Sequence, residues 1–414
     1  MLDFTQVVKE LDKTIFENKK LYSVMKDRFK IALENFSELD SNWEEFQRRL
    51  KEDLNERNSF WHIPISKLKI SEKFPLPNSI ENYTVVAVDG SQIYPDSHEV
   101  TPCYLINLGI ICLTYGENSN AEMNSEALLF AKEDEIFPRI NGRKVQVNSA
   151  LVDFNRDILE REKLSEICLS KLENTNLFGL IDGTLIPWVL GTEIPGRFTP
   201  DDLKEDNLKR DILERYSKVY AELYEAKIPF ASYISSSRSN EVTNFLRLNL
   251  CDQNQIDCKN CKPRLEKKEI TCEKINGISD SELLGEILEE GERTQVFLST
   301  SEALNAKIEG EELFPFHLKI GFFYLKVQNE VARIEIPIWL TDFPEKLDFI
   351  HSQIYLQSQK GLGFPISIAE AHNFAVVSNR ERETFYRLFE NSFTKEKFSV
   401  KLSNKQLNKR IKVT

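Results

Sequence analysis

The sequence lacks any long hydrophobic run: no stretch of its 414 residues approaches the length of about 18 apolar residues that suggests a membrane-spanning helix. Residues 1–6 also lack the basic and apolar regions of a signal peptide. We therefore expect a cytoplasmic protein with no membrane partner. In a reducing compartment, its seven cysteines are expected to be thiols or metal ligands and not a disulfide framework.

An excess of positive charge is also missing, since the formal net charge is −12. This balance argues against a surface that coats nucleic acid through its charge alone. It leaves room for a local basic groove, and a metal-dependent nuclease needs acidic side chains at its centre. The hydrophobic fraction of 41% is ample for a large core, and the length suggests two or three domains or one elaborated α/β domain.

Two short hydrophobic segments end in the same way. Residues 85–88 are β-branched or small and precede Asp89-Gly90-Ser91, and residues 177–181 precede Asp182-Gly183-Thr184. Each Asp-Gly pair alone is an ordinary turn sequence. Two such strands, however, would bring two carboxylates to one edge of a sheet, where a divalent metal could bind. No other internal repeat is visible.

The order of predicted elements indicates the fold class. Strands are expected at 85–88, 103–113 and about 127–131, followed by a helix over 148–172, the second Asp-Gly strand, a helix ending at 226 and a strand over 228–234. Antiparallel strands followed by alternating α and β elements are typical of a ribonuclease H-like α/β fold, a mixed sheet flanked by helices. In that order, Asp89 and Asp182 end the first and fourth strands.

The flanking regions differ in composition. Residues 1–75 are predicted to be a helical region, either a hairpin that packs on the main domain or an arm that docks a partner. The main domain is expected over 80–392, with a cysteine-rich insertion at 251–275. A basic tail, 393–414, completes the chain and is either a solvated end or a contact for phosphates or an acidic partner.

A third acid and an imidazole are candidates for the same metal site. Glu160 lies beside apolar Ile158 on the predicted helix before the second Asp-Gly strand, so it could point inward, but Glu162 and Glu166 are close alternatives. His372 shares a predicted helix face with Ile368, so we expect it to be inward. Either a satisfied core histidine or a catalytic group would fit this position.

Four of the cysteines fall within 22 residues. Cys258 and Cys261 form a Cys-x-x-Cys pair, flanked at uneven distances by Cys251 and Cys272. Four thiolates suit a structural Zn²⁺ site, and the same ligands also hold iron–sulfur clusters. Free thiols remain the alternative. Cys103, Cys112 and Cys168 are expected to be core residues.

Several motifs, taken in order, resemble the NurA nuclease family. They extend over roughly residues 80–390, and each is weak alone, whereas the ordered set is fairly specific. The matching pieces are Val88-Asp89-Gly90-Ser91, Arg156-Asp157-Ile158-Leu159-Glu160, Ile181-Asp182-Gly183-Thr184-Leu185, Ser235-Ser236-Ser237-Arg238-Ser239, Arg333-Ile334-Glu335-Ile336-Pro337, Phe364-Pro365 and Glu370-Ala371-His372.

The resemblance implies a function and a set of roles. It implies a Mn²⁺-dependent (or Mg²⁺-dependent) 5′–3′ DNA exonuclease with single-strand endonuclease activity, a homodimeric ring, and partnership with a HerA-type hexameric ATPase in DNA end resection. Asp89, Glu160 and Asp182 would bind the metal, and His372 would be a further ligand or an acid/base. Ser91 and Arg238 would contact substrate phosphate.

The sequence departs from the family pattern in two places. Phe364 stands where a tyrosine is expected, and the serine-rich segment lacks the lysine often found there, which leaves Arg238 to hold a phosphate. Two other functions therefore remain open. One is a catalytically weak scaffold that docks an ATPase, which the phenylalanine favours, and the other is an RNA nuclease of the same fold.

Overall fold

The chain divides into two compact units in the computed structural model. Unit 1 comprises residues 1–76, 234–300 and 321–334, and unit 2 comprises residues 77–233, 301–320 and 335–414. The structure describes residues 2–54, 59, 61–95, 103–140, 143–173, 176–187, 207–252, 256–308 and 310–395. No helix within these ranges is long and apolar enough to cross a membrane.

Unit 2 is built on five strands in the order β4-β3-β2-β7-β8. β2 pairs antiparallel with β3, and β3 pairs antiparallel with β4, whereas β7 runs parallel to both β2 and β8. This is the strand order of ribonuclease H-like folds, so the predicted fold class is confirmed. The strands are β2 (Tyr83–Ile93), β3 (Tyr104–Tyr115), β4 (Asn120–Phe130), β7 (Leu177–Asp182) and β8 (Phe230–Ile234).

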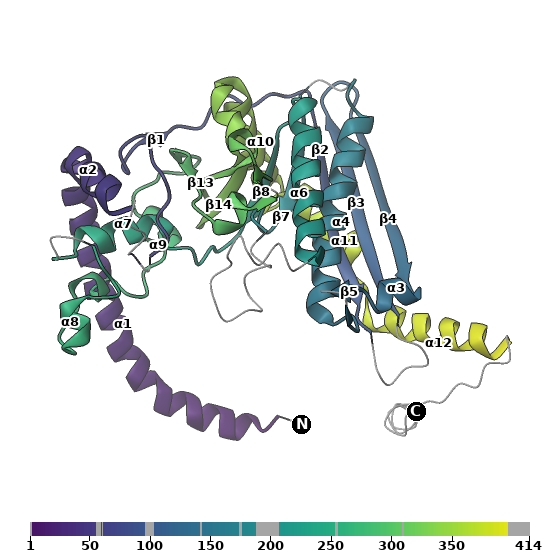
Figure 1. Cartoon of the computed structure of the whole chain (residues 1–414), viewed down its shortest axis with the longest axis horizontal. Helices are drawn as coiled ribbons and strands as arrows, with labels where there is room; N and C mark the ends of the chain where they lie inside the picture. Colours follow the sequence, from purple (N-terminus) through teal and green to yellow (C-terminus); the bar gives the residue numbers. More distant parts are fainter. Residues whose placement is uncertain are drawn as a thin grey trace. The chain divides into compact units, whose positions relative to one another are not determined.

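Helices cover both faces of this sheet (Figure 1). α4 (Ser149–Ser170) packs on one face and α11 (Ile366–Ala375) on the other. Because alternate residues of a strand point to opposite faces, Gly90 of β2 faces α4 and Asp89 faces α11. The other described helices of unit 2 are α3 (Glu133–Ile136), α6 (Asn207–Glu225), η3 (Glu302–Asn305), η4 (Phe316–Leu318), η5 (Ile338–Asp342), α10 (Pro344–Lys360) and α12 (Asn379–Lys395).

β2 lies at the centre of unit 2, and its largely apolar sequence suits that position. Residues 83–88 are all buried, since β2 has paired strands on both sides and helices on both faces. Val86 and Val88 belong to a core that includes Ile158 and Leu164 of α4. Two-residue strands complete unit 2 as two antiparallel pairs: β5 (Arg139–Ile140) with β6 (Arg143–Lys144), and β11 (Lys307–Ile308) with β12 (Glu311–Glu312).

Unit 1 has its own core. Phe36, Trp43 and Phe46 come from the N-terminal helices and pack in one cluster with Phe245 and Leu246. The helices of unit 1 are α1 (Phe4–Ser41), α2 (Trp43–Leu54), α7 (Glu241–Asn249), α8 (Lys262–Leu265), η2 (Thr271–Glu273) and α9 (Asp280–Gly285). Its strands are β1 (Lys73–Phe74), β9 (Arg293–Thr294), β10 (Phe297–Leu298), β13 (Ile320–Val327) and β14 (Glu330–Pro337), of which residues 320 and 335–337 belong to unit 2.

Some predicted boundaries were wrong. β2 does not end at Asp89: it continues to Ile93, because β3 still pairs with it there. The strand expected at about 127–131 is the end of β4, which begins at Asn120. α9 begins with a capping box, in which the Ser279 hydroxyl oxygen accepts a hydrogen bond from the Glu282 backbone N–H. Nearly all of the predicted basic tail lies outside the described residues.

Candidate active site at the edge of the unit 2 sheet

Asp89 and Asp182 lie next to each other at the place where β2 and β7 part. The parallel pairing of these strands ends at Val88 opposite Ile181, and each acid is the next residue of its strand. Each carboxylate also accepts a hydrogen bond from the backbone N–H of its own following glycine, 2.8 Å for Asp89 and 2.9 Å for Asp182. The two Asp-Gly segments therefore have matching local geometry on neighbouring strands.

His372 meets Asp89 from α11. Its Nδ1 lies 2.8 Å from Asp89 Oδ2. The imidazole is 63% exposed, whereas the Asp89 side chain is only 14% exposed. The expectation that His372 is buried was therefore wrong: it lies in the last turn of a ten-residue helix, where its ring is open to solvent above the carboxylate. This geometry suits a group that exchanges protons with solvent.

Glu160 approaches the same place from α4. It is 5% exposed, and its Oε1 has no hydrogen-bond partner; the nearest cation is Nε of Arg156, at 3.4 Å. A Cβ on Gly90 would stand 2.7 Å from that oxygen, so the glycine permits the approach. Burial raises the pKa of Glu160 well above its ordinary value, and the negative charges of Asp157 and Asp89 raise it further.

Asp182 shares this electrostatic environment. Loss of hydration raises its pKa although its residue is exposed overall, and the negative charge of Asp89 adds to the effect. The Gly183 N–H, His372 and Arg156 act in the opposite direction. Asp89 thus repels both of the other acids. A carboxylate whose negative charge opposes the ionisation of two neighbouring acids makes a place that favours a cation.

The other candidate glutamates have different partners. Both carboxylate oxygens of Glu162 accept hydrogen bonds from Arg215, each at 2.8 Å. Glu166 is exposed and pairs with Lys163 at 2.7 Å. Of the three candidate glutamates, Glu160 is therefore the one that the negative charge of Asp89 reaches.

Two buried charged residues, Glu335 and Arg161, hold the loop that follows Asp182. Glu335 is 1% exposed and accepts hydrogen bonds from Thr184 Oγ1 at 2.7 Å and Leu185 N at 2.8 Å. Arg161 is also 1% exposed; it pairs with Asp157 at 2.5 Å and donates to the Thr184 carbonyl. Glu335 belongs to a segment that matched the family pattern but received no role from the sequence. Arg161 was not singled out, because an i,i+4 pair such as Asp157 and Arg161 is normally a surface feature.

Arg156 is the other residue that was missed. It donates from Nη1 to the Gly90 carbonyl at 3.2 Å, and it is the cation closest to Glu160. Its side chain is 31% exposed, so it connects the buried acid with solvent. The quoted motif that begins at Arg156 was the only signal, and it did not indicate a role for the arginine.

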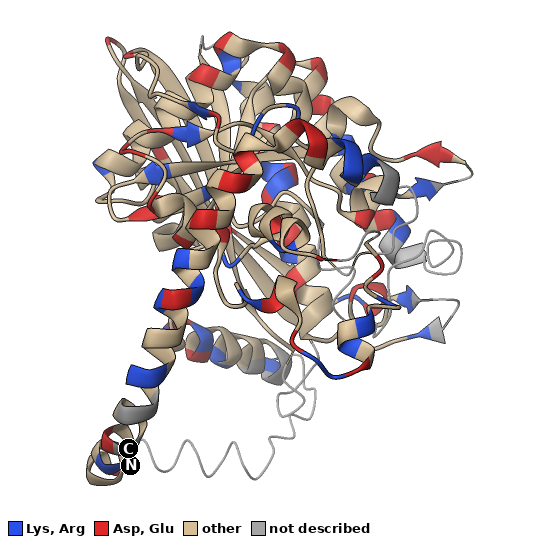
Figure 2. Ribbon diagram, turned by 90° about the vertical axis from the view of Figure 1, so that its left-hand side faces the viewer, with Lys and Arg blue, Asp and Glu red and all other residues tan. Residues whose placement is uncertain are grey.

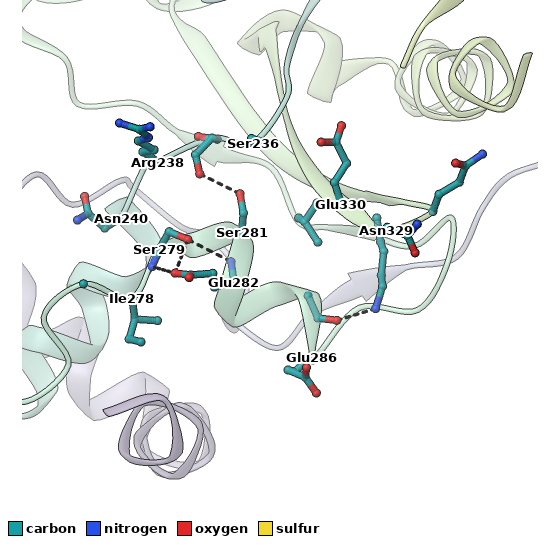
Figure 3. Close-up of a pocket in the computed structure, with 16 residues that line it drawn as sticks. Ser236, Arg238, Asn240, Ile278, Ser279, Ser281, Glu282, Glu286, Asn329 and Glu330 are labelled. Atoms are coloured by element: carbon teal, nitrogen blue, oxygen red, sulfur yellow. Dashed lines mark hydrogen bonds between the residues drawn. The ribbon is translucent and has the colours of Figure 1, made fainter. Parts of the chain in front are cut away.

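The residues predicted to bind phosphate have other settings. Ser91 donates its hydroxyl to the Ala375 carbonyl at 2.5 Å, which secures the end of α11. Arg238 belongs to unit 1, where it lines a polar pocket of about 940 Å³ and points away from Glu282 (Figure 3). Phe364, at the position of the expected tyrosine, packs edge-on against Tyr233 with ring centroids 5.3 Å apart.

Cys272 of unit 1 lies within electrostatic reach of the other three clustered cysteines. Burial raises the pKa of Cys272 to about 11, and negative charge on Cys251, Cys258 and Cys261 contributes to the rise. Cys272 is buried, and the other three are partly exposed. Within the described residues, no three or more His, Cys, Asp or Glu side chains are drawn together tightly enough to hold a metal ion, here or around Asp89.

The site thus gathers two neighbouring strand aspartates, a buried glutamate and an exposed histidine on a ribonuclease H-like fold. The NurA domain family matches residues 83–377, most of the chain, and the protein belongs to this family. Family membership makes it a nuclease, and nucleases of this kind generally use a divalent metal. No curated protein matches the chain.

Solved structures with detectable similarity include two enzymes that act on nucleic acids. The catalytic domain of human Endonuclease V is 10% identical and has a TM-score of 0.30, with 75% of this chain and 85% of that domain covered. Prototype Foamy Virus Protease-Reverse Transcriptase is 14% identical, with a TM-score of 0.22, over 38% of this chain and 18% of that one. These values are too low to support an argument about function.

Proposed function

We propose that the protein is a Mn²⁺-dependent DNA nuclease, a 5′–3′ exonuclease with endonuclease activity on single strands, and that Asp89, Glu160, Asp182 and His372 form its active site. The observation that carries the proposal is the orphaned, buried oxygen of Glu160 beside two mutually repelling aspartates. Hard carboxylate oxygens suit Mg²⁺ and Mn²⁺, and an imidazole favours Mn²⁺. The donor set therefore fits such a cation.

The chain's own groups divide the remaining work. A bound divalent cation would polarise the phosphodiester and acidify water. His372, hydrogen-bonded to Asp89 and open to solvent, can take a proton from the attacking water or deliver one to the leaving oxygen. Arg156 is placed to balance the charge of Glu160 and of an incoming phosphate. Glu335 fixes the loop that follows Asp182, because it accepts hydrogen bonds from Thr184 and Leu185.

A nuclease assay with matched variants tests this function. Purified protein is incubated with 5′- and 3′-labelled single- and double-stranded DNA and RNA, in Mn²⁺, Mg²⁺ or EDTA. We expect 5′–3′ digestion of DNA in Mn²⁺, none in EDTA, and at least about a 100-fold loss for Asp89→Asn and Glu160→Gln. Glu162→Gln, on the same helix but paired with Arg215, should stay active.

Each alternative function has its own outcome in that assay. RNA cleaved in preference to DNA would make the protein an RNA nuclease. No cleavage of any substrate in Mn²⁺ would favour the noncatalytic scaffold. Full activity of Asp89→Asn would disprove the proposed site, and loss of activity in Glu162→Gln but not in Glu160→Gln would move the third acid.

We further propose, on the basis of family membership, a cytoplasmic homodimer that acts with a HerA-type hexameric ATPase in DNA end resection. Co-purification of the full chain with such an ATPase, and stimulation of end digestion by ATP, would support this partnership. Equal digestion with and without the ATPase, together with no complex on size exclusion, would contradict it.

For unit 1 we propose that Cys251, Cys258, Cys261 and Cys272 hold a structural Zn²⁺ or an iron–sulfur cluster. The supporting observations are the electrostatic influence of Cys251, Cys258 and Cys261 on Cys272 and the little regular structure around them, one four-residue helix and one 3₁₀ turn. Small segments without much core are often stabilised by a metal. Metal analysis of the purified protein tests this, and a content of zinc and iron far below one per chain would contradict it.

A further inference from the structure

A pocket of about 430 Å³ lies on the α11 face of the unit 2 sheet. Its volume falls within the range of about 300–1,000 Å³ that is typical of sites for small ligands. Residues of β2, β3 and β4 line it from the sheet, and residues of α11 and α12 line it from the helices. The lining residues that define its chemistry are Asn107, Ser125, Asn373, Phe374, Glu381 and Phe385.

This pocket lies beside the candidate active site. Phe374 is two residues after His372 on α11. In the sheet, Ser125 of β4 is in register with Gly109 of β3, and Gly109 is in register with Asp89 of β2, so the three residues form one row on the same face. Adjacent strands lie about 4.8 Å apart, which places Ser125 about 10 Å from Asp89.

Hydrogen bonds hold both helical walls of the pocket against the sheet. The side-chain amide of Asn107 donates to the carbonyl oxygens of Phe374 and Ala375, at 3.1 and 2.7 Å. On α12, the Tyr386 hydroxyl donates to the backbone carbonyl of Tyr94, just after β2, at 3.3 Å. The pocket is therefore already formed in the free protein, which lowers the cost of filling it.

The lining combines aromatic rings with unpaired polar groups. Phe374 is 37% exposed, and Phe385 of α12 is partly exposed. Within the described part of the chain, the Ser125 hydroxyl and the Asn373 amide have no hydrogen-bond partner. Aromatic rings stack on the faces of nucleobases, and hydroxyl and amide groups bind their edges. These groups suit a nucleobase, which is a flat ring with polar groups along its edge.

The charges favour a base over a phosphate in this pocket. Of the described residues that line it, only Glu381 is charged. Its carboxylate accepts hydrogen bonds from the hydroxyl and the N–H of Ser378, which lower the pKa of Glu381, so it stays ionised and repels phosphate. Among the described residues drawn in Figure 2, Lys and Arg are interspersed with Asp and Glu. Contacts with uncharged bases therefore gain importance for holding a strand.

We propose that this pocket binds one unpaired base of the substrate strand, one to three nucleotides from the phosphate that is cut. The proposal rests on the nuclease function proposed above and adds a base-binding subsite to it. The range follows from the separation of about 10 Å and a spacing of about 3.4 Å between nucleotides of a stacked strand. Phe374 stacks on the base, and Asn373 and Ser125 bind its edge. A paired base cannot enter, so the subsite selects single strands.

Binding of labelled single strands tests the pocket without cleavage. Full-length protein in EDTA is titrated with a fluorescent DNA strand of about 12 nucleotides, and with a strand of the same length and backbone that has no bases. Wild type should bind the normal strand at least about tenfold more tightly. Phe374→Leu, which keeps an apolar side chain but lacks the ring, should lose most of this preference. Phe316→Ala, at another exposed phenylalanine of unit 2, should keep it.

Thermal unfolding confirms that both variants fold. No binding of the normal strand, or the same preference in Phe374→Leu as in wild type, would overturn the proposal. A preference that Phe374→Leu loses and Phe316→Ala retains would support it.

Cleavage of strands with single abasic sites locates the subsite in the reaction. In Mn²⁺, one abasic position within three nucleotides of the cut should raise the KM of wild type about tenfold with little change in kcat, and should not impair Phe374→Leu further. If wild type cleaves no strand, the proposed function fails, and the binding comparison in EDTA still decides the pocket. If wild type cleaves but no abasic position matters, the pocket proposal fails and the nuclease function stands.

Discussion

Glu160 is a buried acid with a raised pKa, and this gives a pH prediction. Its pKa in the folded chain lies above the ordinary value of about 4.3. Over the pH range between these two values, the folded state holds a proton that the unfolded state has lost. The free energy of unfolding of the metal-free protein should therefore fall as pH rises from about 4.3 through the raised pKa.

Glu160→Gln should remove much of this pH dependence. In EDTA, the variant should unfold at a higher temperature than wild type above the raised pKa, because no buried carboxylate has to ionise, and the difference should shrink toward about pH 4. Thermal unfolding at a series of pH values measures this. Glu162→Gln is the control, since that acid already has Arg215 as its partner. Parallel curves for wild type and Glu160→Gln would contradict the prediction.

Glu335 supports the site through backbone and hydroxyl groups and not through substrate. Glu335→Ala would leave the Leu185 N–H and the Thr184 hydroxyl without their acceptor in a buried place. We expect a loss of about 2–3 kcal/mol in the free energy of unfolding and a fall in kcat larger than the change in KM. Glu335→Gln keeps one acceptor oxygen and should recover part of both. Equal stability of the alanine variant and wild type would contradict this role.

At the scale of single residues, the sequence indicated the two aspartates of the candidate site but not the residues that hold the loop after Asp182 in place. Two hydrophobic segments that end in Asp-Gly suggest neighbouring strand ends, and the structure places Asp89 and Asp182 side by side. Arg161 and Glu335 carry no such local pattern. Their partners lie in the loop after Asp182, so only the folded chain shows why these charged residues are buried.

The packing of α11 on β3 depends on a glycine. A Cβ on Gly109 would stand 2.1 Å from the carbonyl oxygen of Ala371 and 2.6 Å from the nitrogen of Ala375, and both are backbone atoms. Gly109→Ala therefore forces α11 away from the sheet, and His372 moves with it. We expect a cost of about 1–3 kcal/mol in the free energy of unfolding and a loss of nuclease activity of at least about tenfold.

Gly285→Ala, at the end of α9 in unit 1, is the control for the effect of an added Cβ. The nearest atom to its added Cβ is Val331 Cγ2, at 3.9 Å, which is an ordinary contact. This variant should keep the unfolding temperature and activity of wild type. If Gly109→Ala behaved like this control, the close approach of α11 to β3 would not be what positions His372.

Element types followed from the sequence better than element ends did. The β-branched run of β2 and the helical stretch of α4 are local signals, and these elements form as expected. The ends depend on neighbours. β2 continues from Asp89 to Ile93 because β3 pairs with it over these residues. β4 extends over residues 120–130 as an exposed edge strand, because it pairs with β3 along that length.

At the scale of the whole molecule, two possible metal sites belong to different compact units. The carboxylate site lies in unit 2 and the cysteine cluster in unit 1, and they share no residue. Any ligand that binds the folded state alone raises its stability, by about 2.7 kcal/mol at a concentration 100 times its dissociation constant. If both proposals hold, the protein should respond to two metals through separate and independent sites.

Single variants should therefore separate the two responses. Asp182→Asn should lose the rise in unfolding temperature that Mn²⁺ gives, while a zinc or iron chelator still lowers it. Cys258→Ser should show the reverse. Cys168→Ala, which removes a buried thiol from the core of unit 2, should lower the starting temperature but keep both responses. Loss of both responses in either site variant would show that the sites are coupled, and a Mn²⁺ response that survives in Asp182→Asn would exclude this carboxylate as a necessary ligand.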